Sequence, residues 1–303
     1  MNPSESGGRE GSSSGGRGGS SAGGREGWAS DEPSWRDHLD RPTEAPPTPD
    51  ADAPAAYGPI GAFQGEAYRR NAFAHGTDEE LAALRALVPL EVGTRVLDVG
   101  CADARHLRRL ATAGVVGVGV DVAPALIGAG RAAAHREGVE VELLTGDARE
   151  LTAVLTAAGA ATPGPGGFDV VWSLCQGALG TSPVSDPGVV AELAAAVRPG
   201  GWVVVTLFHA LFAARHLAPG DAFDTRHLVH HQRSEVRGPD ERRREFDLWT
   251  AAYTAREGIR LLTDAGLTVH SVRGAEPGGY GRRTAGEVAL DDPELLLVAT
   301  RPA

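Results

Sequence analysis

The sequence predicts an α/β fold in which a doubly wound, mostly parallel sheet is covered by helices on both faces. Short runs rich in Val and Leu alternate with segments of helical periodicity, as is typical of strands joined by crossover helices. The strand predicted at 95–99 is followed by a tight turn, a helix and a second buried strand, 116–121, that ends in Asp121. Acids at the carboxyl ends of parallel strands face the crevice in which such folds bind ligands.

The elements follow in a regular order. Aromatic residues mark a first helix over 63–75, and the spacing of Thr77 and Glu80 predicts a capping box that opens a second helix. The alternating elements are then strand 95–99, helix 105–113, strand 116–121, helix 124–136, strand 139–144, helix 149–158, strand 168–173, helix 187–197 and strand 202–207.

This alternation stops after the fifth strand. Two longer polar runs, 226–236 and 242–252, flank Arg-Gly-Pro-Asp-Glu and predict a β-hairpin. Thr254 and Glu257 form a second predicted capping box, which begins a helix over 255–265. The last two strands are predicted at 267–273 and 294–300.

Composition limits the classes of partner. The 303 residues carry a net charge of −11, which argues against a nucleic acid or an anionic membrane as partner. All 29 basic residues are arginine, so no lysine is present to form a Schiff base or act as a base. With two cysteines the chain is not a disulfide scaffold. The N-terminus lacks a signal pattern and no apolar run is long enough to span a membrane, so we expect a cytoplasmic protein.

Two regions differ in composition. Residues 1–56 are rich in Gly, Ser and Pro with few large aliphatic residues, and we expect this tail to be disordered. Its Gly-Gly-Arg pieces resemble segments that bind RNA, but the tail has twice as many acids as arginines, which favours a linker. Residues 57–303 are predicted to form one domain.

Five short motifs occur in order along the domain. They are Val-Leu-Asp-Val-Gly-Cys-Ala-Asp-Ala (96–104), Gly-Val-Asp-Val (119–122), Gly-Asp-Ala (146–148), Phe-Asp-Val-Val-Trp-Ser (168–173) and Val-Arg-Pro-Gly-Gly (197–201). Together they resemble the motifs of the class I S-adenosylmethionine-dependent methyltransferases, over 77–207 and more loosely over 254–303. The resemblance implies a seven-stranded sheet of order 3-2-1-4-5-7-6 with the last strand antiparallel, and S-adenosyl-L-methionine as cofactor. It also implies that residues 57–76 form an N-terminal lid and that residues 209–253 form an inserted cover over the substrate.

The resemblance also implies a cofactor site at the strand ends. Asp121 would accept hydrogen bonds from the ribose hydroxyls, Asp147 would hold the adenine amino group, and Asp98 would orient the first loop or the methionine amine. Gly100 lets backbone amides approach the ligand closely. The complete implied set is Asp98, Gly100, Cys101, Ala102, Asp121, Val122, Asp147, Ala148 and Ser173.

Three positions in the first loop keep other functions open. Ala102 and Ala104 stand where the family has glycine, and each added methyl could weaken cofactor binding. A catalytically degenerate protein that acts as a binding or regulatory module is therefore an alternative. A nicotinamide-dependent oxidoreductase is a third hypothesis, but a dinucleotide fingerprint would need glycine at position 105, which is Arg105.

For catalysis, we expect methyl transfer to an O or N atom of a small organic acceptor. His209 follows the fifth strand and is our candidate general base, and Gln176 is a candidate to orient the acceptor. Tyr68, Trp249 and Tyr253 are candidate substrate-binding residues, the latter two on one face of a strand. We expect no metal site, because the histidines at 227, 230 and 231 lack acids at a known ligand spacing. The sequence does not indicate an oligomeric state.

Overall fold

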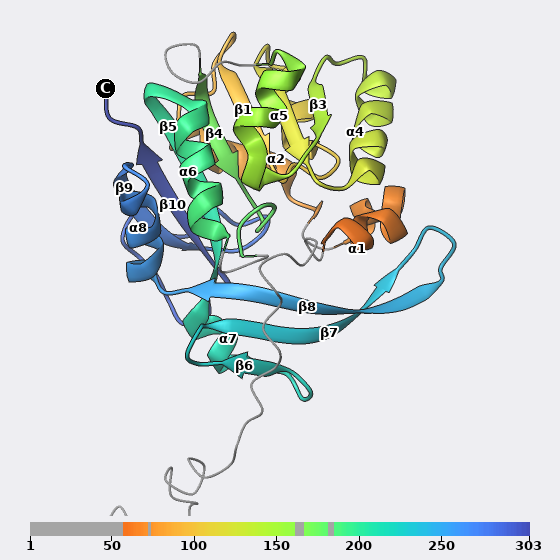
Figure 1. Ribbon diagram of the computed structural model, residues 1–303, viewed down its shortest axis with the longest axis vertical. Helices are drawn as coiled ribbons and strands as arrows, with labels where there is room; N and C mark the ends of the chain where they lie inside the picture. The colour runs from red at the N-terminus through yellow and green to blue at the C-terminus, as the bar shows by residue number, and fades with distance from the viewer. Residues whose placement is uncertain (1–56, 72–73, 161–166, 181–184) are drawn as a thin grey trace, which may run out of the picture. The chain divides into compact units, whose positions relative to one another are not determined.

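The computed structural model describes residues 57–71, 74–160, 167–180 and 185–303, so the predicted tail 1–56 lies outside the described residues. Within them, seven strands form the central sheet in the order β3-β2-β1-β4-β5-β10-β9 (Figure 1). Their bounds are β1 (Arg95–Val99), β2 (Val116–Asp121), β3 (Glu142–Thr145), β4 (Phe168–Ser173), β5 (Val197–His209), β9 (Thr268–Ala275) and β10 (Glu294–Thr300).

Strand direction follows the predicted pattern. β1 to β5 pair in parallel, whereas β10 runs antiparallel to both β5 and β9. The predicted order 3-2-1-4-5-7-6 with an antiparallel last strand is therefore confirmed. β5 begins at Val197, earlier than predicted. Val197 already pairs with Phe168 of β4, before a register shift in that pairing, and the backbones of Gly200 and Gly201 form hydrogen bonds with Arg301.

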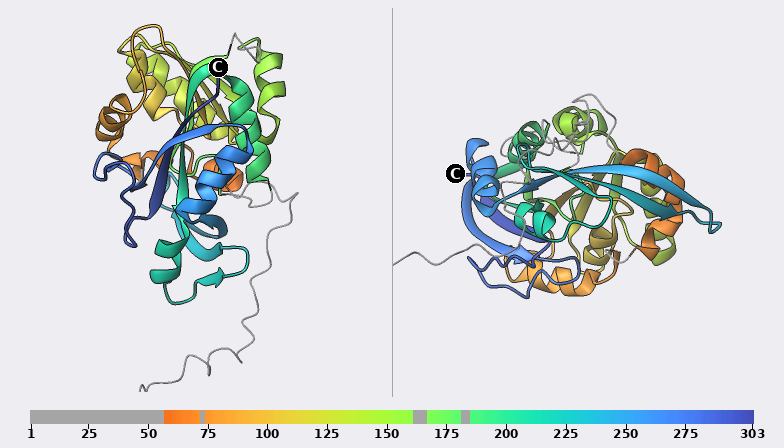
Figure 2. Two further views of the ribbon diagram at one scale, coloured as in Figure 1. Left: turned by 90° about the vertical axis from the view of Figure 1, so that its left-hand side faces the viewer. Right: turned by 90° about the horizontal axis from the view of Figure 1, so that it is seen from below.

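Helices cover both faces of the sheet (Figure 2). One face carries α2 (Thr77–Arg85), α3 (Arg105–Ala111) and α4 (Pro124–Glu137), and the other carries α5 (Leu151–Ala158), α6 (Asp186–Ala196) and α8 (Ala255–Asp264). A short 3-10 helix, η4 (Ala148–Glu150), precedes α5. These helices agree with the predicted bounds to within two residues; the first two residues of the helix predicted over 149–158 belong to η4.

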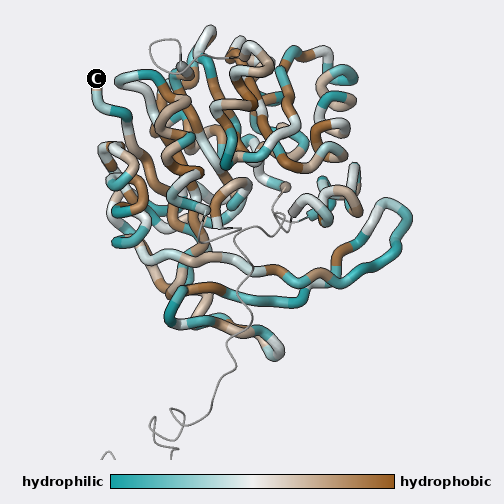
Figure 3. Tube along the Cα trace, in the orientation of Figure 1, coloured by the Kyte–Doolittle hydropathy of each residue, from teal (hydrophilic) through white to brown (hydrophobic). Residues whose placement is uncertain are grey.

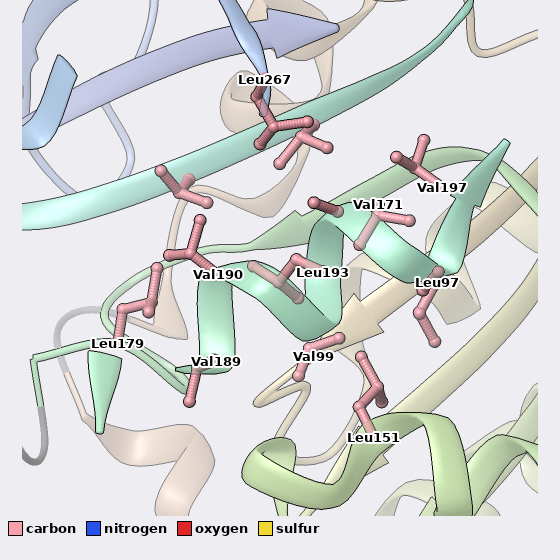
Figure 4. Close-up of a cluster of buried hydrophobic side chains, with 14 of the residues drawn as sticks. Leu97, Val99, Leu151, Val171, Leu179, Val189, Val190, Leu193, Val197 and Leu267 are labelled. Carbon is pink, nitrogen blue, oxygen red and sulfur yellow. The ribbon is translucent and has the colours of Figure 1, made fainter. Parts of the chain in front are cut away.

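Each strand contributes to two apolar layers because its side chains alternate between the faces. In β1, Leu97 and Val99 pack into the layer beneath α5 and α6, while Val96 packs into the layer beneath α2 and α3. Figure 4 shows the first layer, in which Leu151, Val189 and Leu193 of the helices meet Leu97 and Val99. By the same alternation, Asp98 belongs to the α3 side of the sheet.

The predicted hairpin is confirmed and extends from the central sheet. β7 (Val229–Arg237) pairs along its full length with residues 243–251 of β8 (Arg243–Tyr253), and β6 (Ala222–Asp224) pairs with β7. β8 joins β5 through two parallel pairs, Phe208 with Ala252 and His209 with Tyr253. A short helix that the sequence did not predict, α7 (Ala210–Arg215), connects β5 to this hairpin. The hairpin is largely hydrophilic toward its tip, whereas the strands of the central sheet are hydrophobic (Figure 3).

The N-terminal segment differs from the single helix expected over 63–75. It consists of α1 (Tyr57–Gln64) and a 3-10 helix, η2 (Gly65–Arg70), which meet at Gly65 in a left-handed conformation (φ 47°). Gly61 of α1 packs so closely on α4 that an added Cβ would lie 2.9 Å from Cβ of Ala123. The rest of the predicted helix includes Phe73, which lies outside the described residues.

One of the two predicted capping boxes is wrong. Gly76, in a left-handed conformation, is the N-cap of α2, and Thr77 makes no capping hydrogen bond there. Glu80 is instead fully buried, with its carboxylate 2.5 Å from Nη1 of Arg105 and 2.8 Å from Nε2 of His106. The second box is confirmed, since Thr254 accepts from the Glu257 amide and Glu257 accepts from the Thr254 amide.

Candidate functional site

A cavity lies at the carboxyl ends of β1, β2, β3 and β4, where the sequence predicts a ligand crevice. Predicted site residues that follow these four strands line it, together with one from the N-terminal segment. These are Tyr68, Gly100, Ala102, Asp121, Val122, Asp147, Ala148 and Gln176. The cavity is also lined by Ile60, Gly61, Leu126 and Arg149, which were not predicted as site residues.

Asp121 is the acid that holds the first loop. One carboxylate oxygen accepts a hydrogen bond from the Ala102 amide and the other from the Ala123 amide, both at 2.8 Å. Only 8% of the residue is exposed, and burial raises the pKa of its carboxyl group. The predicted loop-orienting role of Asp98 therefore belongs to Asp121 in the structure.

The turns after β1 and β4 touch through their backbones. Gly100 has a φ of +78°, and a Cβ added there would lie 2.1 Å from the carbonyl carbon of Gly177. Cys175 and Gln176, just before Gly177, also have positive φ values of 52° and 56°. Left-handed conformations in non-glycine residues are uncommon and gather at functional sites. This turn brings the Gln176 side chain to the cavity.

Ala102 and Ala104 adopt the backbone conformation that glycine favours. Their φ values are 51° and 57°, which costs about 1–2 kcal/mol at each residue. Ala102 belongs to a small apolar cluster with Ala123 and Leu126, with Tyr68 packed against it. Its methyl group is thus part of the packing between the loop, α4 and the N-terminal segment.

We predict that Ala102→Gly changes S-adenosylhomocysteine affinity by less than about threefold, because the loop already has the glycine-like conformation. Relief of about 1–2 kcal/mol of backbone strain would be offset by about 1 kcal/mol of lost methyl burial. Titration calorimetry and urea denaturation test this expectation. If Ala102→Gly binds more than tenfold tighter, the methyl group obstructs the site and the degenerate-protein hypothesis gains support.

The third strand end presents Asp147 paired with a neighbour. Its carboxylate accepts from the Arg149 amide at 2.9 Å and from the Arg149 guanidinium at 2.6 Å. The hydrogen bond to Arg149 holds the pKa of this carboxyl group below its ordinary value. Asp147 is therefore charged at neutral pH, at the edge of the cavity where Gly146 and Ala148 also lie.

A second, smaller cavity adjoins the first and contains the remaining acid. The two cavities share Tyr68, Gly100, Ala102, Cys175 and Gly177, and Asp98, Cys101, Asp103, Arg105 and His106 line only the smaller one. Asp98 is 2% exposed, and no group of the described residues lies within hydrogen-bond distance of its Oδ2 atom, although the Trp172 indole beside it on β4 lowers the pKa of the carboxyl group. Burial raises the pKa of its carboxyl group to about 7. Such a group indicates a ligand that donates hydrogen bonds or carries positive charge.

Ser173, a predicted site residue, and Cys175 support the turn after β4. The Ser173 side chain is buried, and its hydroxyl accepts from the Ala178 amide at 3.1 Å, so it fixes the β4 turn and does not line the main cavity. The Cys175 thiol lies 3.0 Å from the Tyr280 hydroxyl. Burial raises the pKa of this thiol to about 12, so it is protonated and a poor nucleophile.

The structure places His209 away from both cavities, contrary to our expectation. Its side chain is 2% exposed and its Nδ1 atom donates to the Asp292 carbonyl at 2.9 Å. His209 is not among the residues that line the described cavities. A buried imidazole that bonds to the backbone stabilises the end of β5, and this position does not suit a general base.

Trp249 and Tyr253 also lie away from the cavities. Trp249 packs against His231, with ring centroids 4.6 Å apart, and the Tyr253 hydroxyl donates to Asp186 at 2.5 Å. The hairpin surface that faces the N-terminal segment is formed instead by Gln232 and its cross-strand partner Leu248. Because successive strand residues point to opposite faces, Trp249 points away from that surface.

An open cleft separates the N-terminal segment from the hairpin. Ile60 and Tyr68 line both this cleft and the main cavity, so the two are adjacent. The other lining residues are Gln64, Ala67, Arg70 and Asn71 of the N-terminal segment and Gln232, Ser234, Glu235, Val236, Arg237, Glu241 and Leu248 of the hairpin. Arg70 forms an ion pair with Glu241 at 2.6 Å, and the Phe63 and Phe246 rings pack 5.8 Å apart.

Among the described residues, no group of three or more His, Cys, Asp or Glu side chains is arranged to hold a metal ion. None of the helices described has both the length and the apolar character needed to cross a bilayer.

Comparisons with known proteins agree with the fold. Residues 96–201 match a methyltransferase domain family. A 138-residue stretch is 33% identical to the ubiquinone biosynthesis O-methyltransferase of Bordetella bronchiseptica, covering 42% of this chain and 52% of that protein. The ubiquinone biosynthesis O-methyltransferase of Bordetella avium matches with the same identity and the same coverage. The chain thus spans about half the length of the curated relatives that it matches.

Solved structures extend the fold comparison to most of the chain. The CcbJ methyltransferase from Streptomyces caelestis has a TM-score of 0.63 at 17% identity, covering 80% of this chain and 98% of that one. An S-adenosylmethionine-dependent methyltransferase from Clostridium acetobutylicum has a TM-score of 0.57 at 12% identity, covering 78% of this chain and 95% of that one. At these identities the similarity shows the fold.

Proposed function

We propose that this chain, a member of the class I S-adenosylmethionine-dependent methyltransferases, transfers a methyl group to an oxygen or nitrogen atom of a small organic acceptor. The observation that carries the proposal is the arrangement of Asp98, Asp121 and Asp147. These acids stand at three neighbouring strand ends around two joined cavities. Their separate surroundings suit three different hydrogen-bond donors on one ligand.

The residues present fit the cofactor. S-adenosylmethionine supplies a methyl group on a positively charged sulfur, which makes that methyl electrophilic. Asp121 would accept hydrogen bonds from the ribose hydroxyls, and Asp147 would accept one from the adenine amino group. The buried Oδ2 atom of Asp98, which no group of the described residues reaches within hydrogen-bond distance, would accept one from the ammonium group. The carboxylates carry enough acceptor positions for these contacts beside their present ones.

The cleft between the N-terminal segment and the hairpin would hold the acceptor. We assign the N-terminal segment as a lid and the hairpin as a substrate cover, because both line the cleft and Ile60 and Tyr68 also line the cavity. The charged residues of the cleft are two arginines and two glutamates, so their charges sum to zero. Amide, hydroxyl and aliphatic groups form the remainder. We therefore expect an uncharged acceptor with both polar and apolar parts.

Gln176 would orient the reacting atom of the acceptor. Its Nε2 donates to Oε1 of Glu294 at 3.1 Å, which leaves its carbonyl oxygen to accept from a hydroxyl or amine of the acceptor. Alignment of the nucleophile with the methyl group is the main contribution that a protein makes to such a displacement. The name of the Bordetella relatives, O-methyltransferase, supports an oxygen nucleophile.

A thermal-shift measurement on the full chain tests the proposal first. S-adenosylmethionine or S-adenosylhomocysteine at 100 times its Kd stabilises a protein by about 2.7 kcal/mol, which is a rise in Tm of roughly 5–10 °C at this size. NADH should give none. Transfer of a radiolabelled methyl group to neutral phenols and amines then tests catalysis. A shift without transfer to any acceptor favours the binding-module alternative, and a shift with NADH alone contradicts the proposal.

A further inference from the structure

A buried carboxylate lies next to Gln176, the residue assigned to orient the acceptor. Glu294 is the first residue of β10, which lies between β5 and β9 in the sheet (Figure 1). It is 2% exposed, and no group of the described residues lies within hydrogen-bond distance of its Oε2 atom. Its Oε1 atom accepts from Nε2 of Gln176 at 3.1 Å. Among the described residues, this glutamine is the single hydrogen-bond partner of the Glu294 side chain.

The position is costly for a charged group. Residues 295–298, which follow on β10, are all apolar and buried, so an apolar side chain would suit this strand. Among the described residues, the one cation that acts on the Glu294 carboxyl group is Arg105, and its guanidinium is paired with Glu80. A buried charge with so little compensation destabilises the folded state. Packing alone therefore does not account for a carboxylate here, and its contact with Gln176 is the feature to explain.

The backbone of Gln176 is fixed by the turn after β4. Its amide donates to Oγ1 of Thr206, a fully buried residue of β5, at 3.3 Å. Its φ of 56° is in the left-handed region, a conformation that persists only where the surroundings enforce it. The next residue, Gly177, touches the backbone of Gly100. The freedom that remains is which end of the Gln176 side-chain amide faces Glu294 and which end faces the cavity.

An ionised carboxylate sets this orientation because it can only accept hydrogen bonds. The Gln176 amide must then turn its NH2 group toward Glu294 and its carbonyl oxygen away from it. Among the described residues no hydrogen bond reaches that oxygen, and Gln176 lines the main cavity. A protonated carboxyl group, or a glutamine at position 294, both donates and accepts, so it leaves either orientation of the amide open.

We propose that Glu294 is a positioning residue that holds the carbonyl oxygen of Gln176 toward the acceptor, so that the site selects reacting atoms that carry a hydrogen. This inference rests on the proposed function. A hydroxyl group or a primary or secondary amine donates to this oxygen, and a lone pair on the same atom stays free. The bond from that atom to the methyl carbon forms as the carbon–sulfur bond breaks, sulfur keeps the electron pair, and the proton leaves to solvent. A tertiary amine or a pyridine nitrogen has no hydrogen to donate and is not held.

The orientation of the amide is tested without cofactor or acceptor, by heteronuclear NMR on the full chain. The sequence contains three glutamines and two asparagines, so the signal of each side-chain amide can be resolved, and the one that Gln176→Leu loses belongs to Gln176. Burial raises the pKa of Glu294 to about 7. The Gln176 signal should therefore shift with a midpoint near pH 7 as Glu294 ionises, and Glu294→Gln should abolish this shift.

The other groups that act on Glu294 keep their charge state near neutral pH. Burial raises the pKa of the Cys175 thiol to about 12 and that of the Tyr280 hydroxyl well above its ordinary value. For Glu80, the effect of burial is outweighed by hydrogen bonds from α3, which hold its pKa below the ordinary value. Arg105 stays protonated. A titration of the Gln176 signal near pH 7 is therefore assigned to Glu294.

Two controls separate Glu294 from its surroundings. Asp98→Asn removes a second carboxyl group whose pKa is about 7, and the Gln176 signal should still shift in this variant. Gln64 pairs with Asn71 through both side-chain amides, and its signal should not follow the titration. A Gln176 signal that stays constant in the wild type, or that shifts equally in Glu294→Gln, would overturn the inference. The wild-type and Asp98→Asn titrations do not depend on the folding of Glu294→Gln.

Activity gives a second readout at saturating S-adenosylmethionine, with the phenol or amine that the acceptor screen identifies as probe. Above about pH 7, kcat/KM for this acceptor should be about 10-fold higher in the wild type than in Glu294→Gln, the effect of one lost hydrogen bond. The two values should converge at lower pH, where Glu294 is protonated. S-adenosylhomocysteine affinity should change by less than threefold. Glu142→Gln, which alters an exposed glutamate at the start of β3, should behave as the wild type.

Three results would overturn the role of Glu294. One is a ratio of wild-type to Glu294→Gln activity that does not depend on pH, and another is cofactor binding weakened as much as activity, since a merely structural role produces either pattern. The third is methylation of pyridine by the wild type as fast as that of the probe. A wild type that binds no cofactor and methylates no acceptor contradicts the proposed function instead, and leaves the NMR titration of Gln176 to decide the contact with Glu294.

Discussion

Asp121→Ala is expected to abolish measurable binding of S-adenosylhomocysteine. The Asp121 carboxylate fixes the first loop through the Ala102 amide and the start of α4 through the Ala123 amide. In the proposed complex it also accepts from two ribose hydroxyls. Loss of two hydrogen bonds to a charged acceptor costs about 3–6 kcal/mol, so the affinity should fall by more than roughly 100-fold.

The alanine variant also leaves two buried amides unpaired, at about 1–3 kcal/mol each. Asp121→Asn therefore serves as the decisive companion, because it keeps one acceptor oxygen and most of the packing. It should fold and bind about 10- to 100-fold more weakly than the wild type. Asp264→Ala, which removes an exposed acid of α8 paired with Arg260, should bind normally. Calorimetry on folded Asp121→Asn with unchanged affinity would remove Asp121 from the cofactor site.

Runs of Val and Leu made the central sheet predictable. The bounds of β1, β2, β4 and β10 agree with those predicted, because a strand covered on both faces needs apolar residues at every position except those that face a ligand. Asp98 and Asp121 could be identified as candidate site residues for the same reason, because an acid in a strand covered on both faces indicates a position that faces a ligand. The motif resemblance predicted a cofactor site at the strand ends, and most of the residues predicted for it line the cavity found there.

The acceptor side could not be predicted in the same way, because sequence periodicity does not tell which face of a strand meets the site. A spacing of four places Trp249 and Tyr253 on one face, but the register with β7 turns that face away and brings Gln232 and Leu248 to the cleft. Glu80 was missed for another reason. A glutamate in the first turn of a helix predicts a cap, and only the fold brings Arg105 and His106 against it.

Gly100→Ala is expected to destabilise the protein by about 2–5 kcal/mol. A residue with a side chain pays about 1–2 kcal/mol for the left-handed conformation of Gly100, and overpacking adds about 1–3 kcal/mol. The overpacking is severe here because the new Cβ would lie 2.1 Å from the Gly177 carbonyl carbon and 2.6 Å from the Ala178 amide nitrogen. Both neighbours are backbone atoms, which cannot rotate away as a side chain would.

Gly138→Ala is the matched control for this substitution. Gly138 ends α4 with a φ of +67°, and a Cβ added there would have nothing within 4 Å. Gly138→Ala should therefore lower the free energy of unfolding only by the cost of the left-handed backbone conformation, about 1–2 kcal/mol. Urea denaturation measures both variants, with and without S-adenosylhomocysteine. Equal losses in the two variants would mean that the β1 and β4 turns do not touch. A much larger loss in Gly100→Ala supports the contact that joins the cofactor loop to the turn carrying Gln176, and so couples the two halves of the proposed site.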